Sequence, residues 1–385
     1  MKKVGVITHY YNSLNYGGNF QAYALVKFLN DNGCNAVQIP YDRSDDWPFS
    51  KMSNGLVKRF VRFFRKPQKE SAATELSYEE LQGIKRRNSL IAEFNTAVIP
   101  HCRVFCKKDL KKIGEFDAFV VGSDQVWHPK AVCSAYLLDF DTGSAKKLSY
   151  AASFAVNALS DDVKPYYKKC LSAFDAVSVR ENSGKDIVKD LIGRDAECAV
   201  DPTLLLSKED WDAVCKDIAL PEKYVFCYFL SPCASARRKA SEYARSINAK
   251  TVFLPYIAEK ICAEDKSFGD VRLFDVSPEQ LLTVVKNAAA VFTDSFHITV
   301  FSVIFKRAFF VFGRSDYSGM GSRLQTLLSM FDMEDRFFPA TEQTENLSFA
   351  DIPAPNYEKR FEKFENAVKK STEFLKNNLG LIFIG

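Results

Sequence analysis

The sequence predicts an α/β protein built from two Rossmann-like domains that face a cleft. Short apolar runs alternate with amphipathic stretches over most of the chain, which is the pattern of βα repeats around a mainly parallel sheet. These runs form two series, separated by a helical-looking segment over residues 208–221 and a break at Pro221. The 385 residues also exceed the usual size of one hydrophobic core, so about two domains are expected.

The first series predicts an N-terminal domain over residues 1–215. Its strands are expected at residues 4–8, 36–39, 116–121, 147–151, 176–179 and 196–200. The second series predicts a domain over residues 216–356. Its strands are expected at 225–230, 251–254, 289–293 and 308–312, with helices at 234–247 and 278–287.

A long helix is predicted over residues 357–378, after Pro353 and Pro355. Phe361, Phe364, Val368 and Leu375 are spaced to form one buried face of that helix. We therefore expect residues 357–385 to pack back across the cleft and to join the first domain.

The composition favours a packed globular protein and argues against a general nucleic-acid binder. Hydrophobic residues make up 47% of the chain and charged residues 26%, close to globular averages. The 52 basic and 48 acidic residues give a net charge of only +4. Nucleic-acid partners are therefore not expected.

The first candidate binding turn follows the strand at residues 4–8 and leads into a helical run. It contains Asn15, Tyr16, Gly17, Gly18 and Gln21. Paired glycines allow a ligand to approach the backbone, and amides at a helix start favour an anion. The alternative is a turn without a ligand, in which the glycines are needed only for a left-handed backbone conformation. Neither the dinucleotide-binding nor the P-loop glycine pattern is present.

A second polar cluster follows the strand at residues 116–121. Gly122 and Ser123 are expected to supply amides and a hydroxyl, and Asp124 and Gln125 to hold sugar hydroxyls. Trp127 is expected to stack on a ring of the ligand. This clustering favours a binding site more strongly than any one of its members does.

Arginines follow two further strands. Arg180 comes directly after residues 176–179, and its fork of donors matches a carboxylate or a phosphate. Arg314, Ser322 and Arg323 follow the strand at 308–312 and offer further groups for an anion.

The segment Thr293–His297 places one of only four histidines at a strand-to-helix turn. Such turns lie at the carboxyl end of a parallel sheet, where ligands bind. A titratable imidazole beside the amides of a new helix suggests acid catalysis on a phosphorylated substrate. The alternative is that Asp294 and Ser295 cap the helix and His297 only fills its first turn.

The N-terminal residues reach Val4 too quickly for a signal peptide, and no apolar run has the ~18–20 residues of a membrane span. A cytoplasmic protein is expected. The ten cysteines are scattered without a C-x-x-C pair, which favours reduced, mostly buried thiols over a metal site. Residues 56–66 interleave aromatic and basic side chains, as in an ordinary helix, a mobile lid or a peripheral contact with the inner face of a membrane.

Six motifs occur in the order known from one family: NYGGNFQAYAL, GSDQVWHP, SYAASF, SVRENSG, DPTLLL and TDSFH. From about Asn15 to Arg323 the chain resembles the polysaccharide pyruvyl transferase family. The resemblance implies a GT-B-like fold and bacterial exopolysaccharide or capsule biosynthesis. It implies transfer of a pyruvyl group from phosphoenolpyruvate to a sugar, with formation of a ketal, release of phosphate, and no metal or other cofactor.

The chemistry of ketal formation suggests roles for individual residues, and for His297 the resemblance suggests the same position. His297 would be the general acid, Arg180 would bind the donor, and Arg314 or Arg323 would neutralise the departing phosphate. Asp124 and Gln125 would orient the sugar, and Asp124 would accept a hydroxyl proton. Ile298 departs from the glycine that usually follows this histidine, and it is expected to narrow the site or shift the helix start.

Two other functions fit the same sequence features. One is a GT-B-type nucleotide-sugar glycosyltransferase, and the other is a non-catalytic glycan-binding protein of a polysaccharide-assembly complex. A free sugar, a sugar nucleotide and a lipid-linked oligosaccharide all remain open as acceptors, as does the oligomeric state.

Overall fold

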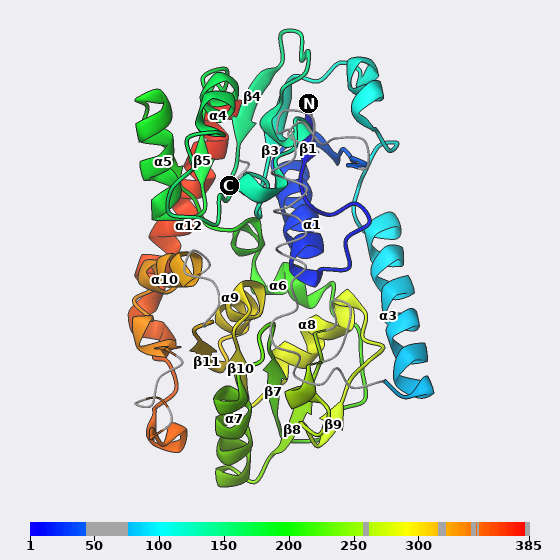
Figure 1. Ribbon diagram of the computed structural model, residues 1–385, viewed down its shortest axis with the longest axis vertical. Helices are drawn as coiled ribbons and strands as arrows, with labels where there is room; N and C mark the ends of the chain where they lie inside the picture. Colours follow the sequence, from blue (N-terminus) through cyan, green and yellow to red (C-terminus); the bar gives the residue numbers. More distant parts are fainter. Residues whose placement is uncertain (44–75, 257–261, 315–320, 340–343, 345, 382–385) are drawn as a thin grey trace. The chain divides into compact units, whose positions relative to one another are not determined.

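The computed structural model describes residues 1–43, 76–256, 262–314, 321–339, 344 and 346–381. They form two compact units (Figure 1). Described residues of the first unit are 1–43, 95–206 and 365–381, and those of the second fall within 76–94 and 207–364.

The first unit contains a parallel sheet with the strand order β2-β1-β3-β4. Its strands are Lys2–Ile7 (β1), Cys34–Gln38 (β2), Ala118–Val121 (β3) and Lys146–Ser149 (β4). Bridges from Leu148 to Ala176 and from Ala152 to Val179 extend it toward Ser178–Val179 (β5), which pairs in parallel with Glu197–Cys198 (β6). The apolar runs form these strands because both faces of a parallel sheet are covered.

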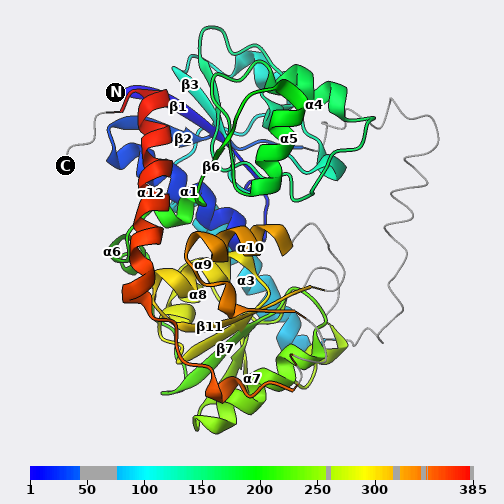
Figure 2. The same cartoon turned by 90° about the vertical axis from the view of Figure 1, so that its left-hand side faces the viewer.

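Helices cover this sheet. They are Tyr16–Asp31 (α1), Lys164–Leu171 (α4) and Asn182–Ile192 (α5). Helices α4 and α5 lie side by side (Figure 2). Phe119 and Val121 of β3 share one buried cluster with Tyr167 of α4 and Ile187 of α5. Alternate residues of β3 therefore form the core beneath these two helices.

The second unit contains a parallel sheet with the strand order β12-β11-β10-β7-β8-β9. Its strands are Tyr224–Tyr228 (β7), Lys250–Phe253 (β8), Val271–Arg272 (β9), Ala290–Thr293 (β10), Ala308–Phe312 (β11) and Phe337–Phe338 (β12). The abundant phenylalanines form much of its core, where Phe292, Phe310 and Phe349 pack with ring centroids 4.6–5.6 Å apart.

Several helices contribute described residues to the second unit. They are Tyr78–Ala97 (α3), Lys208–Asp212 (α6), Ala234–Ser246 (α7), Pro278–Lys286 (α8), Phe296–Ile304 (α9), Gly321–Met330 (α10) and Tyr357–Leu379 (α12). Two of them, α3 and α12, also contribute residues to the first unit. Arg272 on β9 forms an ion pair with Glu80 on α3 at 2.7 Å, which ties that helix to the second unit.

The predicted α/β class is confirmed, and the predicted strands overlap observed ones. The helix predicted over 208–221 is wrong beyond its start, because α6 ends at Asp212 and residues 215–220 have no regular structure. The two-residue strands β9 and β12 were not predicted. The segment 56–66 lies outside the described residues.

The division into units differs from the predicted domains in three places, one of which is that residues 357–364, predicted to join the first domain, belong to the second unit. The first unit ends at Leu206 rather than at residue 215, and residues 76–94 belong to the second unit. Residues 365–381 of α12 belong to the first unit, where Ser371 Oγ accepts a hydrogen bond from the Val200 amide at 3.0 Å. Lys146 Nζ also donates to the Asn378 carbonyl at 2.9 Å.

Each sheet has one point where the strand order reverses. In the first unit it lies between β1 and β3, and in the second between β7 and β10. Ligands of open α/β sheets bind at the carboxyl ends of the strands beside such a point. A ligand site is therefore expected at these two places.

Candidate functional site

The start of α1 does not offer free amides to an anion. Asn15 is the N-cap, and its Oδ1 accepts hydrogen bonds from the amides of Gly17 at 2.9 Å and Gly18 at 3.3 Å. A Cβ on Gly18 would lie 2.8 Å from the His9 carbonyl oxygen, so close packing requires glycine here. Tyr16 is buried. The predicted amide cradle is therefore corrected to a self-capped helix start.

Gln21 and Ser123 are joined in a buried network rather than directed at a ligand. Gln21 Nε2 donates to Thr8 Oγ1 at 2.9 Å, and Gln21 Oε1 accepts from the Ser123 amide at 2.9 Å. Ser123 Oγ donates to the Ala151 carbonyl at 2.8 Å. Gly122 has a φ of 112°, and a Cβ there would clash with the Tyr150 carbonyl oxygen. These residues fix the turn after β3.

Arg180 is enclosed by carboxylates. Its Nη1 lies 2.7 Å from Asp201 and its Nη2 lies 3.1 Å from Asp124, and the residue is only 3% exposed. Burial alone would lower the pKa of Arg180, but Asp124 and Asp201 raise it above its usual value. In this geometry Arg180 holds Asp124 in place, and its predicted role in donor binding stays a prediction.

Asp124 is the carboxylate that this network presents at the first strand-order reversal. It follows β3, adopts a left-handed φ of 68°, and keeps 14% of its side chain exposed. Gln125 comes next, and its carbonyl oxygen lies 3.2 Å from His9 Nε2. Asp124 and Gln125 thus lie where the sequence predicts polar groups for a ligand.

Trp127 is a core residue, which corrects its predicted stacking on a ring of the ligand. It is 0% exposed, and its Nε1 donates to the Tyr136 carbonyl at 2.8 Å. Its ring packs against Phe154 and Phe174 at centroid distances of 5.1 and 5.8 Å. A ring buried in this way has no face left for a ligand.

Sequence reasoning did not select His9 and Arg43, which meet beside Gln125. His9 Nδ1 lies 3.4 Å from Arg43 Nη1, and burial lowers the pKa of His9 to about 4. His9 follows β1 as Asp124 follows β3. Polar residues that come directly after a strand lie at the ligand-binding edge of a parallel sheet, so the sequence could have indicated His9 as well.

In the second unit, Asp294 connects the ends of three strands. Its Oδ1 accepts from the Leu230 amide at 2.6 Å, and its Oδ2 accepts from the Ser231 amide at 3.0 Å, both after β7. Arg314, after β11, donates through Nη2 to the Asp294 carbonyl at 3.0 Å. Asp294 therefore organises the loops, and Arg314 is brought to the end of β10.

His297 lies in the first turn of α9, directly beyond this cluster. Ser295 is the N-cap and makes no side-chain capping bond, so the capping alternative does not hold for Ser295. The residue His297 is partly exposed, but its Nε2 atom is buried, and the ring meets Phe296 edge-on at a centroid distance of 5.2 Å. Ile298 is only 3% exposed, so its side chain packs inside the unit.

The remaining predicted residues lie on α10. Ser322 is in its first turn, and Arg323 follows it with only 5% of its surface exposed. The structure therefore joins Arg314 directly to Asp294, whereas Arg323 is buried on a separate helix.

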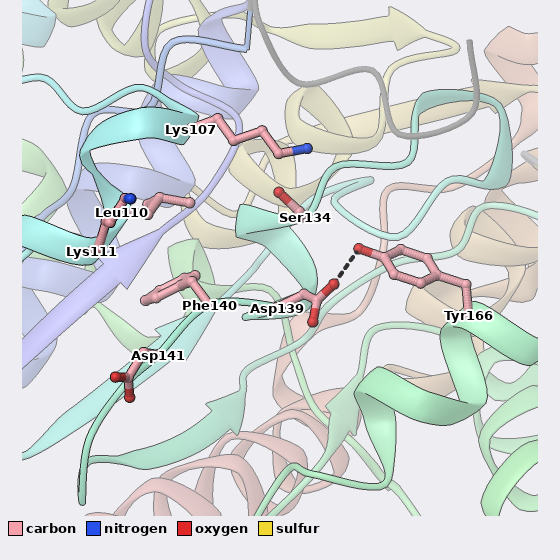
Figure 3. A pocket seen from close by; sticks show the side chains of 8 residues that line it. All are labelled: Lys107, Leu110, Lys111, Ser134, Asp139, Phe140, Asp141 and Tyr166. Atoms are coloured by element: carbon pink, nitrogen blue, oxygen red, sulfur yellow. Dashed lines mark hydrogen bonds between the residues drawn. The ribbon is translucent and has the colours of Figure 1, made fainter. Parts of the chain in front are cut away.

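A pocket of about 390 Å³ lies elsewhere in the first unit (Figure 3). Tyr166 Oη donates to Asp139 Oδ2 there at 2.9 Å. Its lining contains two lysines and two aspartates, so its formal charges cancel and give no preference for an anion. Its full lining is Lys107, Leu110, Lys111, Ser134, Asp139, Phe140, Asp141 and Tyr166. None of the predicted site residues lines it.

Three further features bear on partners. Across the described residues, no helix combines the length and apolarity of a membrane span. Within the same part of the chain, no group of three or more His, Cys, Asp or Glu side chains is arranged to hold a metal ion. All ten cysteines are free thiols, but only Cys34, Cys133, Cys170 and Cys227 are buried, fewer than predicted.

Solved structures share the fold at low sequence identity. The UDP-GlcNAc 2-epimerase of Methanocaldococcus jannaschii is similar with a TM-score of 0.51 and 11% identity, over 96% of this chain and 99% of that one. A structure of S. aureus MnaA with UDP is similar with a TM-score of 0.50 and 11% identity, over 99% and 98% of the two chains. The prediction of a GT-B-like fold with two Rossmann-like domains is confirmed.

No curated protein matches the sequence. The sequence model described as polysaccharide pyruvyl transferase, in contrast, matches residues 15–316. That range runs from Asn15, at the start of α1, to just beyond Arg314, after β11, and it contains the loop after β3 and the loops after β7 and β10. The chain therefore belongs to the polysaccharide pyruvyl transferase family.

Proposed function

We propose that this protein transfers a pyruvyl group from phosphoenolpyruvate to two hydroxyls of a sugar, in a surface polysaccharide or its precursor. The family match over residues 15–316 is the observation that carries the proposal. The loops at the two strand-order reversals support it, because they supply a carboxylate, a histidine and an arginine of the kinds that this chemistry needs.

The proposed reaction begins with protonation of the methylene carbon of phosphoenolpyruvate. His297 donates this proton as the carbon–carbon double bond opens, and the neighbouring carbon becomes cationic. One sugar hydroxyl adds to that carbon and loses its proton. The second hydroxyl then replaces the phosphate, which leaves as the ketal closes. Of the two protons that the hydroxyls release, one replaces the proton that His297 gives to the methylene carbon and the other leaves with the phosphate, so atoms and charge balance.

Asp124 and Arg314 are proposed to handle the hydroxyl proton and the charge of the departing phosphate. Asp124, held by Arg180 at 3.1 Å, is the proposed acceptor for a hydroxyl proton. Arg314, fixed on the Asp294 carbonyl at 3.0 Å, is proposed to neutralise the departing phosphate. The reaction as written needs no redox cofactor, because no electrons are exchanged with another compound.

The test replaces His297 with alanine and measures phosphate release from phosphoenolpyruvate with a panel of sugar, sugar-nucleotide and lipid-linked acceptors. We expect His297→Ala to reduce release by at least ~100-fold, the usual contribution of a general acid. The matched control is His101→Ala, because His101 is an exposed histidine of the first unit. Circular dichroism checks that both variants fold.

Near wild-type release by His297→Ala would remove this residue from the mechanism. Release of nucleotide from a sugar nucleotide, without use of phosphoenolpyruvate, would instead point to a glycosyltransferase. Glycan binding with no release from any donor would point to a non-catalytic protein.

A further inference from the structure

The guanidinium of Arg43 is held in the first unit, just beyond β2, by three contacts. Nη2 donates to the Ala131 carbonyl at 2.9 Å, and Nη1 lies 3.4 Å from His9 Nδ1. The guanidinium carbon also lies 5.2 Å from the centre of the Tyr136 ring. These contacts fix the side chain, but a carbonyl, an imidazole and a phenol ring bring it no full negative charge.

Arg43 therefore differs from Arg180, whose charge is offset by two aspartates. In the described part of the chain, no carboxylate forms an ion pair with Arg43. The buried Nε of Arg43 also lacks a hydrogen-bond partner there. A buried donor without a partner is costly, and a guanidinium fork matches the oxygens of a carboxylate or a phosphate. The arrangement is that of a cation prepared for an anion.

His9 is the group that keeps Arg43 in this position. Its Nε2 lies 3.2 Å from the Gln125 carbonyl, which accepts a hydrogen bond and so places the proton on Nε2. The lone pair of Nδ1 then faces Arg43 Nη1. Because burial lowers the pKa of His9 to about 4, the ring is neutral near pH 7 and does not repel the guanidinium. The ring is also packed 4.6 Å from that of Tyr136.

These residues come from loops that meet at the reversal of the first sheet. His9 follows β1, whereas Gln125 and Ala131 belong to the connection after β3. We propose that Arg43 binds the anionic group, a carboxylate or a phosphate, of a substrate at this place. The inference rests on the proposed function in that phosphoenolpyruvate carries both groups.

The experiment measures binding to the full-length protein by isothermal titration calorimetry, with phosphoenolpyruvate, inorganic phosphate and pyruvate titrated separately. We expect Arg43→Met to weaken the binding of phosphoenolpyruvate at least tenfold. If Arg43→Met weakens the binding of inorganic phosphate but not that of pyruvate, Arg43 binds a phosphate group. If it weakens the binding of pyruvate but not that of phosphate, Arg43 binds a carboxylate. Arg103→Met is the matched control, because Arg103 lies 4.0 Å from the Phe105 ring but remains exposed.

Two more variants separate binding from folding. Arg43→Lys keeps the charge without the fork, so it should bind more weakly than wild type and more strongly than Arg43→Met. His9→Phe keeps a ring beside Tyr136 but removes the acceptor for Arg43, so binding should also weaken. Melting temperatures within the range of the Arg103→Met control would show that these changes are not caused by unfolding.

Equal affinities of wild type and Arg43→Met for every anion would overturn the proposal. Binding of inorganic phosphate but not phosphoenolpyruvate, lost in Arg43→Met, would support the anion site and contradict pyruvyl transfer. A wild-type protein that binds none of the three anions would overturn both.

Discussion

Arg180 sits between Asp124 and Asp201, of which Asp201 is only 1% exposed. Removing the guanidinium would leave a buried carboxylate without its counter-charge. The loss of one partner of a buried pair costs more than the pair itself contributes, because the remaining charge has lost its water. The stability of the first unit and the orientation of Asp124 therefore depend on the same side chain.

We predict that Arg180→Met lowers the free energy of unfolding by about 3–5 kcal/mol, measured by urea denaturation. The double variant Arg180→Met with Asp201→Asn should recover part of this loss, since it also removes the isolated charge. Lys189→Met serves as the control, because the Lys189–Asp195 ion pair is exposed and should change stability by less than about 1 kcal/mol. Equal stabilities of the single and double variants would contradict this explanation.

The start of α5 fixes the loop that follows β4. Glu181 is the N-cap of that helix and is fully buried. Its Oε1 accepts from the amides of Phe154 at 2.9 Å and Ala155 at 3.1 Å, and from Ser153 Oγ at 3.1 Å. The Ser153 amide in turn donates to the Asp124 carbonyl at 2.9 Å. Two neighbouring residues thus hold Asp124 in place. Arg180 contacts its side chain directly, and Glu181 acts on its backbone through Ser153.

We predict that Glu181→Ala destabilises the protein by about 1–3 kcal/mol, because buried amides lose their acceptor. Glu181→Gln retains an amide oxygen for the same hydrogen bonds and should lose less. Chemical denaturation gives both values, and phosphate release from phosphoenolpyruvate should fall more in the alanine variant. A glutamine variant as unstable as the alanine variant would show that the charge, rather than the acceptor, matters.

The strands and the loops that carry the site could be predicted from sequence, because each buried strand is a local apolar run with polar residues after it. The two-residue strands β9 and β12 carry too little pattern to be recognised. The structural roles of Arg180 and Arg43 could not be predicted from sequence. Asp201, which neutralises Arg180, comes from a different loop, and the partners of Arg43 are set by the tertiary fold. Burial of Trp127 is likewise decided by distant rings.

Helix α12 contributes to both compact units through different turns. In the second unit, Tyr357 Oη donates to the Arg307 carbonyl at 2.6 Å, and Lys363 pairs with Asp332 at 2.6 Å. In the first unit, Leu375 is fully buried. The helix therefore makes contacts in each unit, and in the first unit it contributes a buried leucine.

We predict that Leu375→Ala lowers the free energy of unfolding by about 2–5 kcal/mol, the usual cost of emptying a buried leucine site. Lys370→Ala on the same helix should have little effect, because Lys370 is exposed. Denaturation followed by circular dichroism measures both. Equal effects of the two substitutions would mean that this part of α12 is held by something other than its apolar face.

The path of α12 also has a consequence for synthesis on the ribosome. The first unit begins with β1 but takes residues 365–381 from the last helix. Its core can therefore be completed only after these residues have emerged. All described residues of the second unit come earlier than residue 365, so they are available first. The unit that holds the first residues of this sequence is thus also the one that must wait longest for its last residues.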